Sequence, residues 1–117
     1  ASGRPAGSIL TAEYELDGIS FMALNGGPVD QFKLTGGTSY IVECETQEEI
    51  DFFWEKLSAV PESEQCGWCT DKFGVTWQIT PRILDEMMRD PEKSEAVTAA
   101  FMPMKKIDLE TIRKAGE

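Results

Sequence analysis

Apolar and polar residues alternate between residues 9 and 25, which predicts a β-hairpin. The first strand, over residues 9–16, places four apolar side chains on one side: Leu10, Ala12, Tyr14 and Leu16. Asp17-Gly18 is a favoured two-residue hairpin turn, and a return strand over residues 19–25 follows it. Gly26-Gly27-Pro28 then ends the return strand.

The clearest helical pattern follows a predicted strand over residues 38–44. Thr46 and Glu49 form a capping box, in which each side chain satisfies a backbone donor near the start of the helix. The next apolar residues recur at the spacing of one helix face: Ile50, Phe53, Trp54 and Leu57. We therefore expect an amphipathic helix directly after this strand.

A second hairpin is predicted between Cys66 and Pro81. A short strand rich in cysteine and tryptophan leads into a turn over residues 71–74, where Gly74 favours a positive φ. The strand over residues 75–79 then alternates apolar and polar side chains. Pro81 closes this strand, because proline lacks the N–H that a strand ladder needs.

Helical patterns fill residues 82–115. Asp90-Pro91 supplies an N-cap and a first-turn proline for a segment that runs through Phe101 and ends before Pro103. Asp108 is placed to cap a last helix. Strands followed by helices in this order predict one α+β domain over residues 1–117, with a mixed or antiparallel sheet.

The net charge of the chain limits the classes of partner that it is expected to bind. Its 117 residues include 11 Lys and Arg against 21 Asp and Glu, a net charge of −10. A phosphate binder needs a basic face, so no nucleic-acid partner is expected, and an anionic membrane surface is disfavoured for the same reason. We also see no apolar run of about 20 residues and no signal-peptide pattern, so no membrane partner is expected.

Cysteine and histidine usage bears on location and chemistry. The three cysteines are an odd number and do not form a disulfide framework, which predicts a reducing, cytoplasmic location. Histidine is absent, which removes the commonest general base and the commonest transition-metal ligand.

Cys66-Gly67-Trp68-Cys69 has the CxxC spacing of thiol–disulfide exchange proteins. In thioredoxin-like proteins, however, the first cysteine stands at a helix N-terminus, whereas this pair precedes a turn and a strand. Packing within a hairpin is the alternative that we favour. A zinc site is not expected, because Cys44 would be only a distant third ligand and structural zinc takes four.

Four residues are candidates for a ligand site: Asn25, Trp68, Trp77 and Gln78. The two tryptophans lie on neighbouring predicted strands, where they either pair across the hairpin or face a cavity. In one interpretation Asn25 ends its strand and Gln78 faces solvent. In the other, both residues direct their amides into a cup, where they orient a polar ligand.

Several linked motifs from Ile9 onward resemble one known family. They are Leu24-Asn25-Gly26-Gly27-Pro28, Cys44-Glu45-Thr46-Gln47-Glu48-Glu49-Ile50-Asp51, Trp54-Glu55-Lys56-Leu57, Cys66-Gly67-Trp68, Asp71-Lys72-Phe73-Gly74, Trp77-Gln78-Ile79, Pro81 and Met104-Lys105-Lys106-Ile107-Asp108. Together they are similar to the glyoxalase-like proteins often labelled 3-demethylubiquinone 3-methyltransferase, in the vicinal oxygen chelate (glyoxalase/bleomycin resistance/dioxygenase) superfamily. The chain has no glycine-rich strand-to-helix loop for a nucleotide-like cofactor, so methyl transfer is not expected.

This resemblance implies a fold of two βαβββ modules whose curled mixed sheets surround a cup. Residues 38–80 would form the second module, residues 9–25 would be a remnant of the first, and residues 82–115 would be C-terminal helices. The first module is then truncated: either the chain is a fragment or a short form, or a partner subunit completes the sheet. We expect a homodimer, because a bare sheet edge invites pairing.

Members of this superfamily commonly hold a divalent metal with His, Gln or Glu. By the resemblance only Gln78 falls at a ligand position, and one amide does not hold a catalytic metal. The leading hypothesis is a domain that binds a small organic ligand without metal catalysis and without a cofactor. The alternatives are a metal-dependent lyase or dioxygenase completed by a partner chain or a missing N-terminal segment, and a structural remnant without a pocket.

Overall fold

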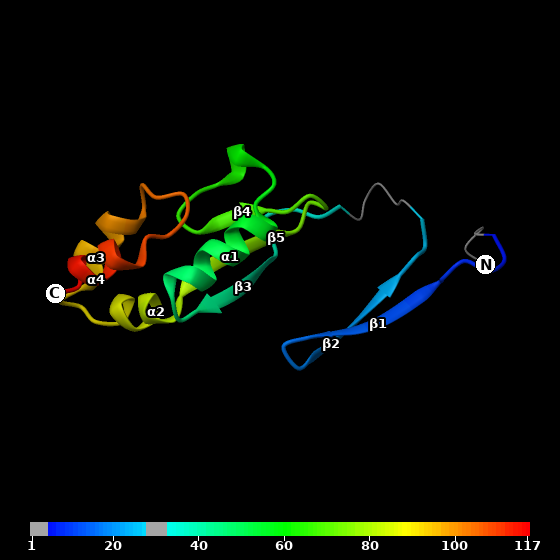
Figure 1. The fold of residues 1–117 in the computed structure, drawn as a ribbon, viewed down its shortest axis with the longest axis horizontal. Helices are drawn as coiled ribbons and strands as arrows, with labels where there is room; N and C mark the ends of the chain where they lie inside the picture. The colour runs from blue at the N-terminus through cyan, green and yellow to red at the C-terminus, as the bar shows by residue number, and fades with distance from the viewer. Residues whose placement is uncertain (1–4, 28–32) are drawn as a thin grey trace. The chain divides into compact units, whose positions relative to one another are not determined.

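The structure is a computed structural model that describes residues 5–27 and 33–117, and it divides into two compact units, residues 1–33 and residues 34–117 (Figure 1). Pro28 of the predicted strand-ending motif lies outside the described residues. The fold is mixed α+β, with a two-stranded sheet, a curled mixed three-stranded sheet and C-terminal helices, which confirms the predicted fold class.

The first unit contains the predicted hairpin. Strand β1 (Thr11–Leu16) pairs antiparallel with β2 (Ile19–Leu24), with Leu16 opposite Ile19. The turn residues Asp17 and Gly18 have φ values of 49° and 81°. Positive φ at both positions defines the primed turn whose twist matches that of the strands. The alternation and the turn sequence therefore predicted this hairpin correctly.

The second unit is built on a three-stranded sheet in the order β3-β5-β4. Strand β3 (Ser39–Cys44) runs parallel to the central strand β5 (Thr76–Pro81), and β4 (Trp68–Thr70) pairs antiparallel with β5. Helix α1 (Gln47–Leu57) connects β3 to the rest of the sheet, and a short 3₁₀ helix, η1 (Pro61–Ser63), precedes β4.

Three helices follow the sheet: α2 (Arg82–Met88), α3 (Ser94–Phe101) and α4 (Leu109–Ala115). They complete one hydrophobic core with α1 and the sheet. Its fully buried side chains come from every layer: Cys44, Ile50, Cys69, Ile79, Val97, Ile107 and Ile112.

The predicted helix caps are confirmed at two places and wrong at a third. The Thr46 side chain accepts a hydrogen bond from the Glu49 N–H, and Asp108 accepts one from the Thr111 N–H. Helix α3 begins at Ser94 rather than at the predicted Asp90-Pro91. The Asp90 carboxylate accepts from the Glu92 N–H at 2.9 Å and thereby closes a separate turn before the helix.

The cysteine- and tryptophan-rich stretch also differs from the prediction at its start. Cys66 and Gly67 have φ values of 37° and 90° and form a two-residue turn between Gln65 and Trp68. Strand β4 therefore begins at Trp68. The Cys66 and Gly67 N–H groups donate to the carbonyls of Met104 and Lys105, which ties the C-terminal segment to this turn.

Candidate functional site

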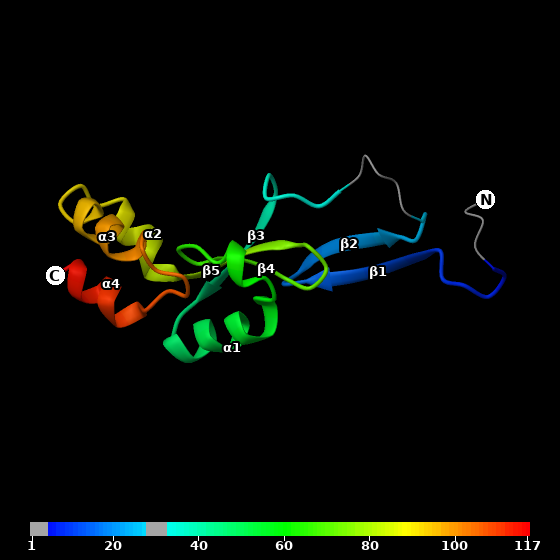
Figure 2. The same cartoon turned by 90° about the horizontal axis from the view of Figure 1, so that it is seen from above.

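The two faces of the three-stranded sheet carry different residues. On one face, Val42 lies opposite Ile79 and Cys44 lies opposite Pro81, and this face packs against α1 through Ile50. Figure 2 shows α1 along one side of the sheet. Because side chains alternate along a strand, the residues between these positions point to the other face.

We call this other face of residues 34–117 the open face. It is made of eight residues: Ser39, Ile41, Glu43, Trp68, Thr70, Thr76, Gln78 and Thr80. Ile41, on the edge strand β3, is 59% exposed. A half-buried sheet face that combines hydroxyls, an amide and two large apolar side chains is suited to hold a small molecule.

Gln78 lies at the centre of the open face. Its register partners are Ile41 on β3 and Trp68 on β4. The Gln78 Nε2 donates a hydrogen bond of 2.9 Å to the Ser39 Oγ, which fixes the direction of the amide. Within residues 5–27 and 33–117, no hydrogen bond engages the Gln78 Oε1 or the Ser39 hydroxyl proton. The pair therefore presents one acceptor and one donor to a ligand.

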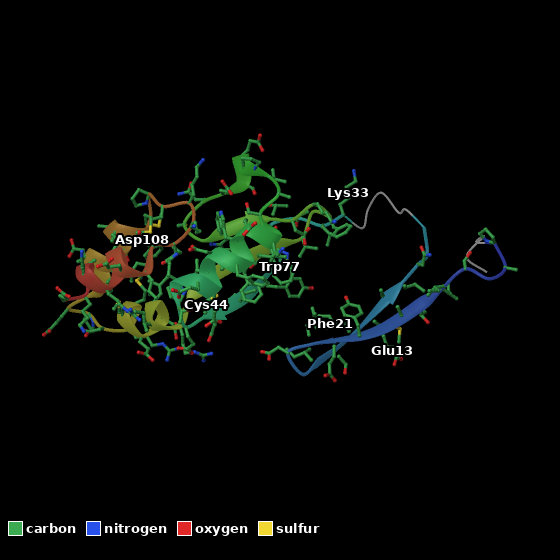
Figure 3. The ribbon with its side chains drawn as sticks, viewed as in Figure 1. Glu13, Phe21, Lys33, Cys44, Trp77 and Asp108 are labelled. Atoms are coloured by element: carbon green, nitrogen blue, oxygen red, sulfur yellow. The ribbon has the colours of Figure 1, made fainter. Side chains whose placement is uncertain are left out.

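Trp77 lies on the opposite face from Trp68 and Gln78. Its register partners are Tyr40 and Cys69, and its ring stands 5.5 Å from that of Tyr40 (Figure 3). The two tryptophans are therefore not a cross-strand pair. The Trp77 Nε1 donates to the Asp71 Oδ2 at 2.9 Å, which gives this tryptophan a structural contact at the end of the hairpin.

Asp71 organises the turn between β4 and β5. Its Oδ1 accepts hydrogen bonds from the Phe73 N–H at 2.8 Å and the Val75 N–H at 3.0 Å. Desolvation alone would raise the pKa of Asp71, but the hydrogen bonds from Trp77 and from the turn backbone outweigh it and lower the pKa. Gly74, at a φ of 92°, takes the positive value predicted for this turn.

Asn25 belongs to the first unit and closes the hairpin there. Its backbone N–H donates to the Leu10 carbonyl at 2.7 Å, and its Nδ2 donates to the Ile9 carbonyl at 3.1 Å. Of the four residues that the sequence nominates, the structure thus brings Trp68 and Gln78 onto one face. Ser39 joins them and was missed by the sequence reasoning.

The cysteines lie away from the open face. Burial raises the pKa of both Cys44 and Cys69 to about 11, with Glu49 adding to it at Cys44 and Glu64 and Asp71 at Cys69. Burial also raises the pKa of Cys66, which stands in the turn before β4. These are the surroundings of inert thiols, opposite to those that activate a redox cysteine.

Two hollows elsewhere on the surface were not predicted. The larger, of about 680 Å³, lies between the start of α1 and helix α4. Half of its lining residues are acidic and two are basic: Glu45, Thr46, Gln47, Glu48, Asp108, Leu109, Glu110, Arg113, Lys114 and Glu117. The other, of about 480 Å³, lies on the hairpin. Within the described parts of the chain, no group of three or more acidic or cysteine side chains is arranged to hold a metal ion.

The curled mixed sheet, with a helix on one face and further helices after it, is compatible with a truncated glyoxalase-like module. The chain belongs to the family described as 3-demethylubiquinone-9 3-methyltransferase, a glyoxalase-like family, which it matches over residues 1–80. At the level of this family it is a small-molecule-binding domain. A search of curated proteins finds no match. Among the helices that the structure describes, none has the length and apolar character needed to cross a membrane.

Proposed function

We propose that this protein binds an uncharged small organic molecule on the open face of its three-stranded sheet. The observation that carries this proposal is the Gln78–Ser39 hydrogen bond, which directs an amide from the middle of the face and leaves its carbonyl oxygen ready to accept. A residue oriented in this way loses little freedom when a ligand arrives, which favours binding.

The surroundings of Gln78 indicate the chemistry of the ligand. Trp68, directly opposite Gln78, offers an aromatic surface for stacking, and Ile41 offers an apolar contact on the other side. Glu43 is the one charged member of the open face, and its carboxylate pairs with Arg82 at 3.1 Å. A ligand carboxylate or phosphate would therefore meet no free cation there, so we expect a planar, neutral ring that carries an amide or hydroxyl group.

We also propose three further properties that were expected from the sequence. They are that residues 38–80 are a second glyoxalase-like module after a remnant over residues 9–25, that the chain forms a homodimer, and that it is cytoplasmic. The three free cysteines support a reducing compartment.

A metal-dependent lyase or dioxygenase is the second candidate function. It is favoured by the family match and by the place of Gln78 in the middle of the central strand β5. In that case a partner chain, or residues beyond this sequence, supply the other ligands. Elemental analysis after equilibration with Mg, Mn, Ni and Zn distinguishes the two: one tightly held ion per chain would put the metalloenzyme first.

The ligand chemistry can be tested with a matched pair of probes. Nicotinamide and nicotinate share a ring and differ in an uncharged amide against a carboxylate. In saturation-transfer NMR we expect nicotinamide to bind the wild-type protein and nicotinate to bind at least tenfold more weakly. Equal or stronger binding of nicotinate would overturn the assignment of an uncharged ligand.

A further inference from the structure

The turn before β4 has a strained backbone. Cys66 has a φ of 37°, a left-handed value that is unfavourable for a residue with a side chain, and Gly67 follows at 90°. Strain of this kind persists only where the surrounding structure holds it, and it is concentrated at functional sites. The contacts that hold this turn therefore indicate what its geometry serves.

Trp68 is the residue that this turn places. Gln65 and Trp68 exchange two backbone hydrogen bonds across the turn, of 3.1 Å and 2.8 Å. Trp68 is also the first residue of β4, a strand of three residues at the edge of the sheet. Because so short an edge strand makes few ladder bonds, the position of Trp68 on the open face depends strongly on the turn.

The loop between α3 and α4, residues 102–108, holds the turn in place (Figure 1). We call it the α3–α4 loop. Its carbonyls accept hydrogen bonds from three successive residues: Gln65 Nε2 donates to Met102 at 2.9 Å, the Cys66 N–H to Met104 at 2.6 Å and the Gly67 N–H to Lys105 at 2.7 Å. Two of these donors are backbone groups of the strained turn itself, so the loop stabilises the turn conformation in which those groups point towards it.

The far end of the α3–α4 loop is anchored by Gln47, the first residue of α1. Its Oε1 accepts from the Leu109 N–H at 2.8 Å, and its Nε2 donates to the Ile107 carbonyl at 3.1 Å. The Ile107 side chain is fully buried, and its Cγ1 lies 3.2 Å from the point where a Cβ on Gly67 would stand. The loop is therefore fixed to α1 at one end and packs against the turn at the other.

We propose that the α3–α4 loop positions Trp68 for ligand binding on the open face, and that Gln65 is the positioning residue between them. Gln65 touches both parts: its backbone pairs with Trp68, and its side chain bonds the Met102 carbonyl. The inference rests on the proposed function, because it concerns the same site, and it adds a loop outside the open face to the parts that set the affinity. By linkage, a ligand that contacts Trp68 also stabilises the docked loop.

The exposed side chain of Gln65 permits a matched pair of variants. Gln65→Met keeps the length of the side chain and removes the donor to Met102. We expect it to weaken nicotinamide binding about threefold, measured by NMR titration, without shifting the urea midpoint of unfolding. Gln65→Lys supplies a donor to the same carbonyl again and should restore the affinity.

The indole N–H cross-peak of Trp68 reports its position in the free protein. In Gln65→Met this cross-peak should shift and its heteronuclear NOE should fall, because the ring is held less tightly. Gln65→Lys should bring both back towards the wild-type values. The cross-peak of Trp54, on α1, should stay unchanged in both variants.

Hydrogen exchange of the wild type tests the coupling in the reverse direction. The Cys66 and Gly67 N–H groups donate to the α3–α4 loop, so they exchange when the loop opens. Nicotinamide at ten times its Kd should slow both about tenfold, because the opened form lacks the site. The Phe73 N–H, which donates to Asp71 in the turn after β4, should keep its rate.

The outcomes separate this inference from the proposed function. A wild type that does not bind nicotinamide overturns both. A wild type that binds, together with a Gln65→Met variant of unchanged affinity or an unchanged Trp68 cross-peak, overturns the inference alone. A lower urea midpoint in Gln65→Met with wild-type affinity does the same, because it assigns Gln65 a role in stability only. Weaker binding and a shifted cross-peak that Gln65→Lys reverses are the results that support it.

Discussion

The Gln78 side-chain amide donates a hydrogen bond of 2.9 Å to the Ser39 hydroxyl, although the two residues are 39 positions apart in the chain. Parallel pairing of β3 with β5 brings them together on the open face. This contact fixes the direction of the one amide in the middle of that face, and the proposed binding function depends on it.

Changing either partner should weaken ligand binding more than folding. Gln78→Leu removes the carbonyl acceptor, and we expect nicotinamide to bind about tenfold more weakly, a loss of about 1.4 kcal/mol. Ser39→Ala frees the amide to rotate and should have a smaller effect in the same direction. Thr70→Val, on the same face, is the control for a lost hydroxyl. Unchanged affinity in Gln78→Leu, measured by NMR titration, would remove Gln78 from the site.

Gly67 should tolerate no side chain. A Cβ there would lie 3.0 Å from the Ile79 carbonyl oxygen and 3.2 Å from the Ile107 Cγ1, and the residue has a φ of 90°. Both the left-handed backbone and the close contact penalise Gly67→Ala, which should lower the unfolding free energy by at least about 2 kcal/mol. Gly36→Ala, where nothing lies within 4 Å of the added Cβ, should change it little. Urea denaturation measures both, and equal effects would contradict the account of this turn.

The Asp71 carboxylate should make stability depend on pH. Its pKa is lowered in the fold from an ordinary value of 3.8, so its ionised form stabilises the fold fully above that value. This contribution is lost as the pH falls through 3.8 towards the lower pKa of the folded state. We therefore expect the unfolding free energy of the wild type to exceed that of Asp71→Asn by less at about pH 3 than at about pH 7. Urea denaturation at the two pH values measures this difference.

Trp77→Phe provides the internal comparison for Asp71. It removes the indole N–H donor and should lower the unfolding free energy by on the order of 1 kcal/mol at neutral pH. The variant should also reduce the pH dependence of the unfolding free energy, because one of the hydrogen bonds that lower the Asp71 pKa is gone. An unchanged pH dependence in this variant would show that the turn backbone alone sets the pKa.

The CxxC spacing should not behave as a redox pair. Burial raises the pKa of Cys69 to about 11, so at about pH 8 its thiolate is scarce and iodoacetamide should alkylate it only after unfolding. Cys44 should behave in the same way. Cys66, the least buried of the three, should react first. Mass spectrometry of peptides locates the label, and rapid formation of a Cys66–Cys69 disulfide would restore the redox hypothesis.

Local signals in the sequence predicted much of this fold. Asp17-Gly18 specified its turn because both positions need a positive φ, and Thr46 and Asp108 marked helix starts because their side chains accept backbone N–H groups three residues on. The Asp90-Pro91 prediction was wrong because the same type of side chain also closes turns, and sequence alone does not tell the two apart.

Features that depend on the pairing of strands far apart in the sequence could not be predicted from such local signals. Alternation showed that Trp77 and Gln78 face opposite sides of one strand, but not that Trp68 lies opposite Gln78, which only the hairpin register decides. Ser39 had no sequence signal of its own. Its role follows from the parallel pairing of β3 with β5, between which α1, η1 and β4 lie in the chain.

The most direct test of the central claim is to locate the ligand by amide chemical-shift mapping of ¹⁵N-labelled protein, including the side-chain amide of Gln78. A ring the size of nicotinamide is expected to bind with a Kd of about 1 mM. The account predicts shifts confined to the open face, at Ser39, Ile41, Trp68 and Gln78, and no shift of the Gln78 side chain with nicotinate at the same concentration. Shifts that fall instead between α1 and α4, or that spare the Gln78 side chain, would contradict it.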